Sequence, residues 1–364
     1  MFRILVLNLG GTSSKVAIYE DLKEIADFTL RHTPEDMKKY PLVKDQVPYR
    51  KKMIEDWLAT YSLTINDFDA VAARGASIPE AYMSGTYLVD GYYKDLLFKV
   101  HKPEDPFVHG IRMITPLAVE MMGDKKIPIY VTDPPSVREQ LPVARICGVK
   151  GFERMAQGHV LNQKAVGRFH AEKLGKDYNK CRFAIAHLGG GVSVAAHENG
   201  KLIDINDAGD GHGPFSPDRA GTVSSGHMLK MFYVEKLPYE VVYKRIRGNA
   251  GVKGHLGTND MREVAERIKN GDEFAKLIFD AMIYQVAKEL GGCIVALRGD
   301  VDAILVTGGI AKSDYLIDGL KYYLEKLAPV VAYPGEFENQ ALAAGAYRVL
   351  SGQEQPIILQ PVNS

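Results

Sequence analysis

The sequence predicts an α/β protein made of two similar domains, and three observations support this prediction. The chain has 364 residues, more than the ~100–200 residues usual for a single domain. Short, almost wholly apolar runs alternate with helical patterns, as expected for central strands that helices cover on both faces. A glycine-rich hairpin pattern near the N-terminus recurs in the second half, which indicates an internal duplication.

The predicted elements follow one another along the whole chain. Strands are expected at the apolar runs 3–9, 69–73, 127–131, 183–188 and 302–307, and helices over 160–174, 274–290, 315–327 and 340–350. The segment 160–174 is expected to be a core helix whose solvent face carries Lys164, Arg168 and Lys173.

The duplication pairs the segment 3–17 with the segment 182–196. Identical residues recur at constant spacing: Arg3, Leu9, Gly10, Gly11, Ser14 and Ala17 match Arg182, Leu188, Gly189, Gly190, Ser193 and Ala196. Each copy is a strand, a glycine turn and a second strand, which is a hairpin and not the strand-to-helix turn of a P-loop. A second pair, 69–75 against 302–308, is an apolar strand that ends in a glycine turn. Chance matching of apolar strands is the alternative.

From this duplication we expect two domains with a ligand cleft between them. The first should span residues 1–148 together with about 340–364, and the second residues 149–339. Both glycine turns should then face the ligand, and closure of the cleft would exclude water from it.

Composition excludes several classes of partner. Lys plus Arg and Asp plus Glu both number 45, so no overall field favours nucleic acid or an anionic membrane. Three widely spaced cysteines without a CxxC pair fit a reducing compartment, and we expect a cytoplasmic protein. The apolar run 4–9 is far shorter than the ~20 residues of a membrane helix.

The two hairpin turns are candidate phosphate sites. Glycines let backbone N–H groups approach an anion without a Cβ clash. Side-chain donors accompany both turns: Asn8, Thr12, Ser13 and Lys15 in the first, and His187 and Ser193 in the second. A polyphosphate is the natural ligand, although Lys15 alone would also suit a solvated hairpin and Asn8 a turn support.

A third glycine turn, 307–313, follows a predicted strand and leads into a predicted helix. Such a turn lets a flat ring lie against backbone, so a nucleotide base or ribose is a plausible ligand. An ordinary strand-to-helix turn is the alternative.

Two charged residues end buried strands. Arg74 follows the apolar strand 71–73, and its fixed, always charged fork suits a carboxylate. A structural salt bridge is the alternative. Asp133 follows another apolar strand and precedes Pro134-Pro135, a position that suits Mg²⁺, although it could also cap its own turn.

Taken together, these residues resemble the acetate kinase family, within the larger group that includes actin, Hsp70 and hexokinase. The resemblance rests on Asn8-x-Gly-Gly-Thr-Ser-Ser-Lys15, His187-Leu-Gly-Gly-Gly191, the segment 204–221, Thr307-Gly-Gly-Ile310 and Tyr333-Pro-Gly-Glu336. It covers nearly the whole chain. The stretches 213–219 and 333–336 look like the butyrate kinase branch, which includes kinases of branched acids such as isobutyrate.

The resemblance implies two ribonuclease H-like (actin-like ATPase) domains and ATP-dependent phosphorylation of a short-chain fatty acid. It implies Mg²⁺, ATP and ADP as ligands, a small carboxylic acid as substrate, and a homodimer or larger homo-oligomer. Such an enzyme commonly runs in the direction of ATP synthesis in fermentation.

The resemblance also assigns site residues. Catalytic roles fall to Arg74, Asp133 and Lys15, and phosphate binding to Asn8, Gly10, Gly11, Ser13, His187, Gly189, Gly190 and Gly191. Nucleoside contacts fall to Asp260, Arg262, Gly308, Gly309 and Ile310, and metal contacts to Asp133, Asn8 and Glu338. Without the resemblance, Asp260 and Arg262 would be a helix cap and a surface charge.

Two departures from the family pattern stand out. Acetate kinases carry a catalytic histidine in a Gly-Phe-His context, where this chain has Glu153. His159 is a nearby substitute, and a structural histidine at the start of a helix is the alternative. Acetate kinases also carry an arginine after the proline-rich loop, for which Arg219 is the candidate replacement, with a salt bridge within the loop as the alternative. Rival interpretations are a sugar or alcohol kinase in which Asp133 deprotonates a hydroxyl, and a nucleotide-driven clamp like actin or Hsp70.

Overall fold

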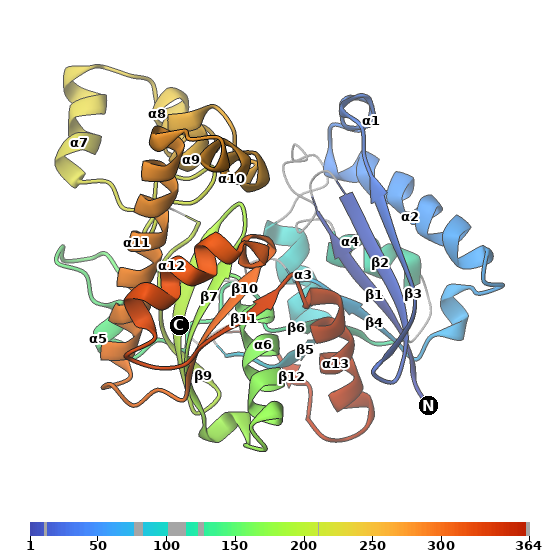
Figure 1. Ribbon diagram of the computed structural model, residues 1–364. Coiled ribbons are helices and arrows are strands. Elements are labelled where there is room, and N and C mark those ends of the chain that lie inside the picture. Colours follow the sequence, from blue (N-terminus) through green and yellow to red (C-terminus); the bar gives the residue numbers. More distant parts are fainter. Residues whose placement is uncertain (11–12, 76–82, 101–113, 123–126, 210, 362–364) are drawn as a thin grey trace. The chain divides into compact units, whose positions relative to one another are not determined.

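The computed structural model describes residues 1–361 apart from 11–12, 76–82, 101–113, 123–126 and 210, and its α/β class confirms the prediction (Figure 1). The chain forms two compact units, residues 1–137 with 337–364 and residues 138–336. The boundary expected near residue 148 falls inside the second unit. Within the described ranges, no helix is long and apolar enough to cross a membrane.

The first unit contains a seven-stranded sheet of order β12-β5-β6-β4-β1-β2-β3. Its strands are β1 (Arg3–Leu9), β2 (Ser13–Glu20), β3 (Lys23–Arg31), β4 (Ala70–Ala73), β5 (Thr86–Leu88), β6 (Ile129–Thr132) and β12 (Ile357–Ile358). β1 pairs antiparallel with β2 and parallel with β4, and β4 pairs parallel with β6. β1, β4 and β6 therefore end at the same edge of the sheet.

Helices cover both faces of this sheet. They are α1 (Pro34–Lys39), α2 (Val43–Ala59), α3 (Gly91–Val100), α4 (Ile114–Met122) and α13 (Glu338–Leu350), with a short η1 (Ile65–Asp67). Leu5 and Leu7 of β1 pack in one core with Leu117 of α4. Because side chains alternate along a strand, Asn8 points to the other face, where it contacts Glu338 of α13.

The second unit repeats this topology. Its five strands have the order β11-β10-β7-β8-β9, which corresponds to β6-β4-β1-β2-β3 of the first sheet. They are β7 (Arg182–Leu188), β8 (Val192–Glu198), β9 (Lys201–Ile205), β10 (Ala303–Gly308) and β11 (Val330–Pro334). The second hairpin of each unit also carries a register shift, at Ile18/Tyr19 and at Ala196/His197. The predicted duplication is confirmed.

Helices flank the second sheet in the same way. They are α5 (Pro142–Arg145), α6 (Val160–Lys173), α7 (Ser225–Leu229), α8 (Tyr239–Ile246), α9 (Gly251–Leu256), α10 (Met261–Lys269), α11 (Glu273–Ala296) and α12 (Asp314–Leu324), with short η3 (Tyr178–Lys180), η4 (Lys230–Val234) and η5 (Gly309–Lys312). Ala184 and Ala186 of β7 share a core with α11 and α12. The alternate face, which carries His187, contacts α6.

One expectation for α6 is wrong. Lys164 was expected in solvent, but its side chain is 0% exposed and its ammonium lies 2.9 Å from a carboxylate oxygen of Glu139. The ammonium also donates to the carbonyl of Gly200, and Glu139 accepts the backbone N–H of Leu202. Helical periodicity could not reveal this partner, because Glu139 lies outside any periodic segment.

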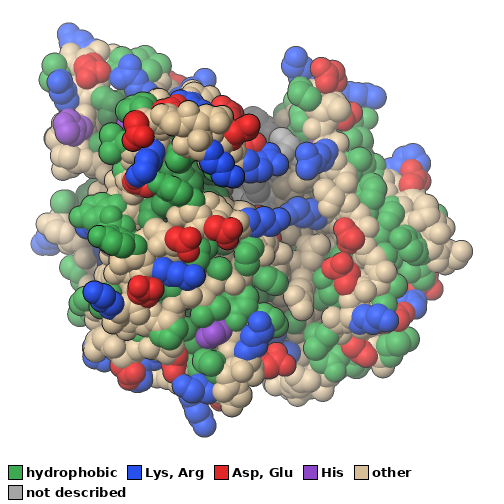
Figure 2. Space-filling view, in the orientation of Figure 1, with side chains coloured by type: hydrophobic (Ala, Val, Ile, Leu, Met, Phe, Trp, Pro, Cys, Tyr) green, Lys and Arg blue, Asp and Glu red, His purple; other side chains and the backbone are tan. Residues whose placement is uncertain are grey.

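Charged side chains of both signs lie on the face of the molecule that Figure 2 shows. Figure 2 shows Lys and Arg interspersed with Asp and Glu over the visible face, in keeping with equal numbers of both in the sequence.

Candidate active site

Three of the predicted site residues lie at one edge of the first sheet. Asn8 is the next-to-last residue of β1, Arg74 follows β4, and Asp133 follows β6. Because these three strands are parallel neighbours, their carboxyl ends meet. Ligands of open α/β sheets bind at this edge.

Asn8, Arg74 and Glu338 form a hydrogen-bonded cluster. Arg74 Nη1 lies 2.8 Å from Glu338 Oε2 and 3.3 Å from Asn8 Oδ1. Asn8 Nδ2 donates to the same Glu338 oxygen at 2.9 Å and to Asn339 Oδ1 at 3.1 Å. The side chain of Glu338 is 5% exposed and that of Arg74 is 27% exposed. The ion pair considered as an alternative for Arg74 is therefore present, and it fixes the guanidinium at the strand ends.

Asp133 is buried and held by a neighbouring loop. Its Oδ1 accepts the N–H of Gly85 at 2.9 Å, and its own N–H donates to the Gly85 carbonyl at 2.9 Å. Its φ of +43° is a left-handed conformation that Asp tolerates better than most residues. The hydrogen bond from Gly85 thus orients the carboxylate.

These residues supply oxygen donors of the kind that Mg²⁺ prefers. Asp133 and Glu338 offer carboxylates and Asn8 an amide oxygen, and Mg²⁺ usually takes one or two carboxylates and keeps several waters. Among the residues that the structure describes, no three His, Cys, Asp or Glu side chains form a ready-made metal cluster. The donor set fits a water-rich Mg²⁺ site rather than a closed metal cage.

The first glycine turn rests on an arginine that the sequence did not single out. Arg50 of α2 is fully buried, and its Nη1 donates to the carbonyls of Gly10 and Ser13 at 3.1 and 3.3 Å and to Ser14 Oγ at 3.0 Å. Burial lowers the pKa of Arg50 to about 10, so the guanidinium stays charged at neutral pH. By holding the carbonyls from within the unit, Arg50 fixes the shape of the turn.

The other predicted residues of this turn lie on the hairpin. Lys15 stands directly opposite Asn8 in the β1–β2 register, and Ser13 begins β2. Gly11 lies outside the described residues. The sequence alone does not distinguish Arg50 from an arginine on the exposed face of a helix.

Replacing Arg50 with Met is expected to destabilise the protein by about 3–5 kcal/mol, because it leaves buried carbonyls without their charged donor. Arg50→Lys should be intermediate, since an ammonium keeps the charge but not the planar fork. Chemical denaturation followed by circular dichroism would measure both. A Met variant as stable as the wild type would show that the turn keeps its shape without Arg50.

The second glycine turn is held by its own backbone and by the loop that carries Ser216 and Arg219. Gly189 N–H donates to the Gly191 carbonyl at 3.1 Å, and Ser216 Oγ donates to the Gly190 carbonyl at 2.6 Å. The guanidinium of Arg219 lies against Gly191, where an added Cβ would come within 2.8 Å of its Nη1. Burial, and next the nearby Arg247, lowers the pKa of Arg219. The structure thus brings the candidate replacement arginine to this turn.

His159, the candidate substitute for the missing family histidine, lies at the second turn. Its ring stacks on that of His187 with centroids 3.8 Å apart and an interplanar angle of 6°. Glu153 instead pairs with Arg145 at 2.8 Å, and its side chain is 47% exposed. Glu153 is therefore a surface ion-pair residue in this structure.

The third glycine turn joins β10 to η5. Gly308 has a φ of +94° and exchanges two backbone hydrogen bonds of 3.0 Å with Gly335. Gly309 and Ile310 begin η5, and no described atom lies within 4 Å of the position that a Cβ would take at Gly309. A flat ring could approach the backbone at this open position.

Asp260 and Arg262 occupy the positions of a helix cap. Asp260 caps α10, with its Oδ1 accepting the N–H of Arg262 at 2.9 Å. The Arg262 guanidinium pairs with Asp260 at 2.6 Å, and its side chain is 92% exposed. The helix-cap interpretation is confirmed, and a nucleoside contact by these residues stays a prediction.

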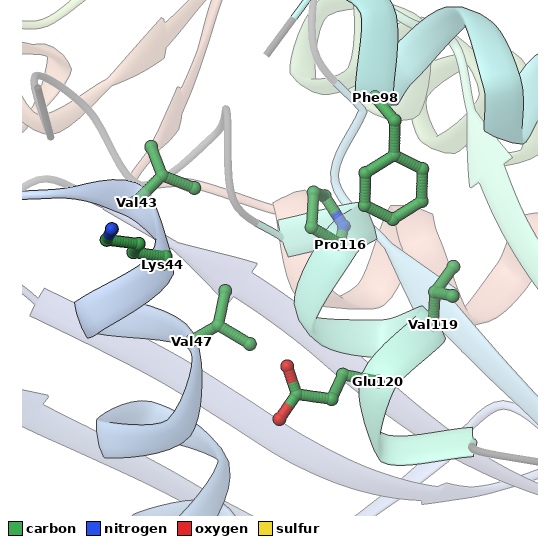
Figure 3. A pocket seen from close by; sticks show the side chains of 7 residues that line it. All are labelled: Val43, Lys44, Val47, Phe98, Pro116, Val119 and Glu120. Carbon is green, nitrogen blue, oxygen red and sulfur yellow. The ribbon is translucent and has the colours of Figure 1, made fainter. Parts of the chain in front are cut away.

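A separate apolar hollow of about 220 Å³ lies among α2, α3 and α4 (Figure 3). Figure 3 shows Val43, Val47, Phe98, Pro116 and Val119 around it, with Lys44 and Glu120 beside them. It lies on the face of the sheet that α2 and α4 cover, whereas Asn8 points to the α13 face. It is therefore not part of the polar cluster.

Comparison with known proteins decides the family. Residues 154–333 match the acetokinase family. Butyrate kinase 1 of Clostridium acetobutylicum is 40% identical over 356 residues, covering 98% of this chain and 99% of its own length. The chain belongs to the acetate kinase family. A probable butyrate kinase of Clostridium botulinum is 41% identical over 355 residues, covering 97% of this chain and 98% of its own.

A solved member of this family has the same fold. The acetate kinase of Porphyromonas gingivalis superposes with a TM-score of 0.77 over 96% of this chain and all of that chain, at 20% identity. At this identity the likeness shows the fold alone. It confirms the two-domain fold that the sequence predicted.

Proposed function

We propose that this protein transfers the γ-phosphoryl group of ATP to a short-chain fatty acid, butyrate or isobutyrate, and yields an acyl phosphate and ADP. The observation that carries the proposal is the 40% identity to a butyrate kinase over nearly the full length of both chains. An arginine fixed at the carboxyl ends of three parallel strands supports a carboxylate as the acceptor. The reaction is reversible, so the same site would make ATP from the acyl phosphate.

The acid needs no general base. Its pKa should be near that of a Glu side chain, ~4.3, so at neutral pH it is already an ionised nucleophile. The difficulty is to bring an anionic oxygen to an anionic phosphoryl group. Catalysis should therefore depend on alignment and on positive charge at the reacting oxygens.

In the first unit we assign the acid side of the reaction. Arg74 would hold the carboxylate, and Lys15 would neutralise charge on the transferred group. Asn8, Gly10, Gly11 and Ser13 would donate to phosphate oxygens. Asn8, Asp133 and Glu338 would hold Mg²⁺, which supplies charge neutralisation when it is bound.

In the second unit we assign the nucleotide. The turn from His187 through Gly189, Gly190 and Gly191 would bind the outer phosphates, because its backbone N–H groups and the imidazole are donors. Gly308, Gly309 and Ile310 would receive the base, with Asp260 and Arg262 as contacts to the nucleoside. We further propose a cytoplasmic homodimer or larger homo-oligomer.

The rival functions have less support. A sugar or alcohol kinase would need a base for a hydroxyl, and Asp133 is the only candidate that the sequence offered for that role. A nucleotide-driven clamp has no small acid for Arg74 to bind, which leaves this arginine only its ion pair with Glu338. The curated relatives that support the proposal over nearly the full chain are butyrate kinases.

Hydroxamate trapping of the acyl phosphate tests the proposal directly. ATP, Mg²⁺ and a panel of acetate, propionate, butyrate, isobutyrate and valerate would be supplied, and acyl hydroxamate would be measured by colour. We expect the strongest signal for acids of four or five carbons. Steady ATP hydrolysis without hydroxamate from any acid would overturn the acyl kinase proposal and favour the clamp or the alcohol kinase.

A further inference from the structure

The two ring nitrogens of His187 face different surroundings. His187 is the next-to-last residue of β7 and is 2% exposed. Its Nε2 would lie 3.4 Å from a Cβ added to Gly189, so this edge of the ring faces the second glycine turn. Its Nδ1 lies 2.9 Å from Nδ2 of Asn162 on α6. Which nitrogen carries the proton therefore decides whether the turn meets a donor or an acceptor.

The hydrogen bonds around Asn162 have fixed directions. Thr307 Oγ1 donates to the carbonyl of Gly335 at 3.2 Å, and a carbonyl can only accept. Because a hydroxyl has one hydrogen, the 3.1 Å contact between Thr307 Oγ1 and Asn162 needs a hydrogen from the amide. This requirement places Nδ2 of Asn162 toward Thr307. The same Nδ2 donates to His187, so His187 Nδ1 must accept.

The neighbouring His159 is fixed by the same reasoning. Ser193 Oγ accepts the backbone N–H of His159 and Nε2 of Gln163, both at 3.2 Å. Gln163 is oriented by its 3.0 Å bond to the Ser193 carbonyl. The hydroxyl hydrogen of Ser193 is then directed to His159 Nδ1 at 3.0 Å. Two neutral rings stacked 3.8 Å apart also avoid the repulsion that two imidazolium ions would suffer.

From this chain of directed hydrogen bonds, we propose that Asn162 is a positioning residue that holds His187 as the neutral Nε2–H tautomer. In that tautomer His187 presents an N–H donor to a phosphate oxygen bound at the turn formed by Gly189, Gly190 and Gly191. The stacked ring of His159 fixes the plane of His187. This inference rests on the proposed function, in which the second turn binds nucleotide phosphates.

Asn162→Asp reverses the hydrogen bond and so tests the proposal. A carboxylate only accepts, so Nδ1 of His187 must then carry a proton. Neutral His187 would present an acceptor to the turn, and only the imidazolium would still donate from Nε2. We expect nucleotide affinity in this variant to become pH-dependent and to fall about 10–100-fold from pH 6 to pH 9, the loss of one charge-assisted hydrogen bond. Wild-type affinity should not show this step.

The measurement is long-range ¹H–¹⁵N NMR of the imidazoles in the nucleotide-free protein, followed by ADP titration at each pH. Wild-type His187 should show Nε2–H, and the Asn162→Asp variant Nδ1–H at high pH. If the buried carboxylate prevents folding, Asn162→Leu serves instead, and it should give a mixture of both tautomers. The NMR experiment determines the tautomer without any reaction. A negative hydroxamate assay would therefore count against the proposed function and not against the tautomer of His187.

Tyr178→Phe is the matched control. It removes a buried hydroxyl that lies 3.0 Å from Nδ1 of His197 in the same unit. We expect it to lower stability while His187 keeps its tautomer and ADP affinity stays independent of pH. Wild-type His187 protonated on Nδ1, or an Asn162→Asp variant whose ADP affinity follows the same pH course as the control, would overturn the proposal.

Discussion

Replacing Arg74 with Ala should lower kcat/KM for the acid by about two to four orders of magnitude, because two charge-assisted hydrogen bonds of roughly 1.5–3 kcal/mol each are lost. The KM for ATP should change little, since the nucleotide is assigned to the other unit. Steady-state hydroxamate assays with acid and ATP varied in turn would measure both constants. An equal decrease in kcat/KM for the acid and for ATP would contradict the assignment of Arg74 to the acid.

The Arg74→Ala variant also removes the ion-pair partner of Glu338. The resulting loss of stability must be separated from the loss of activity. Glu338 is 5% exposed, and a buried carboxylate left without its cation typically costs about 3–5 kcal/mol. We therefore expect reduced stability, and activity must be measured where the variant is shown to be folded. Arg74→Lys is the control, because it keeps the charge that Glu338 needs but not the fork that pairs with a carboxylate.

The strands that the sequence predicted lie within about two residues of their observed bounds, whereas β3, β5, β9, β11 and β12 were not predicted. The strand expected at 3–9 has the same bounds as β1, and the strand expected at 302–307 is β10, Ala303–Gly308. These runs are apolar on both faces, and the glycine turns that end them are visible without any knowledge of distant residues. The equal topology of the two sheets followed from the recurring hairpin.

Partners far apart in the sequence were harder to predict. Nothing near Arg74 indicates that its guanidinium pairs with Glu338 from the C-terminal helix. Asn162 lies in a predicted helix, and Arg50 lies in α2, which was not predicted. The periodicity of a helix shows its buried face but not which polar group that face contacts. The prediction that Lys164 is exposed was wrong for the same reason, since its partner Glu139 comes from a segment without periodicity.

At the start of α10, a family motif and a structural motif share the same residues. Asp260 and Arg262 match a nucleoside-contacting pattern, yet an Asp two residues before an Arg at a helix start is also a good cap. Both roles can hold at once, because a capping carboxylate keeps its second oxygen at the surface. Only measurements on bound nucleotide separate them.

Gly308 and Gly309 look alike in sequence, but their replacement by Ala should have opposite consequences. A Cβ at Gly308 would lie 2.3 Å from the Leu188 carbonyl oxygen and would meet a φ of +94°, whereas the Cβ position at Gly309 is open. We expect Gly308→Ala to cost more than about 4 kcal/mol of unfolding free energy, because it must separate β10 from β7 or break the pair with Gly335.

Gly309→Ala should leave stability within about 1 kcal/mol of the wild type. If the adenine lies against this glycine, the added methyl group should still weaken ADP binding, about 10-fold or more for a displaced ring. Denaturation and ADP titration of both variants give the comparison. Normal stability in the Gly308 variant would contradict the close approach of β10 and β7, and normal ADP affinity in the Gly309 variant would move the base away from this turn. A glycine required by the backbone and a glycine required by a ligand are thus distinguished by which of the two measurements changes.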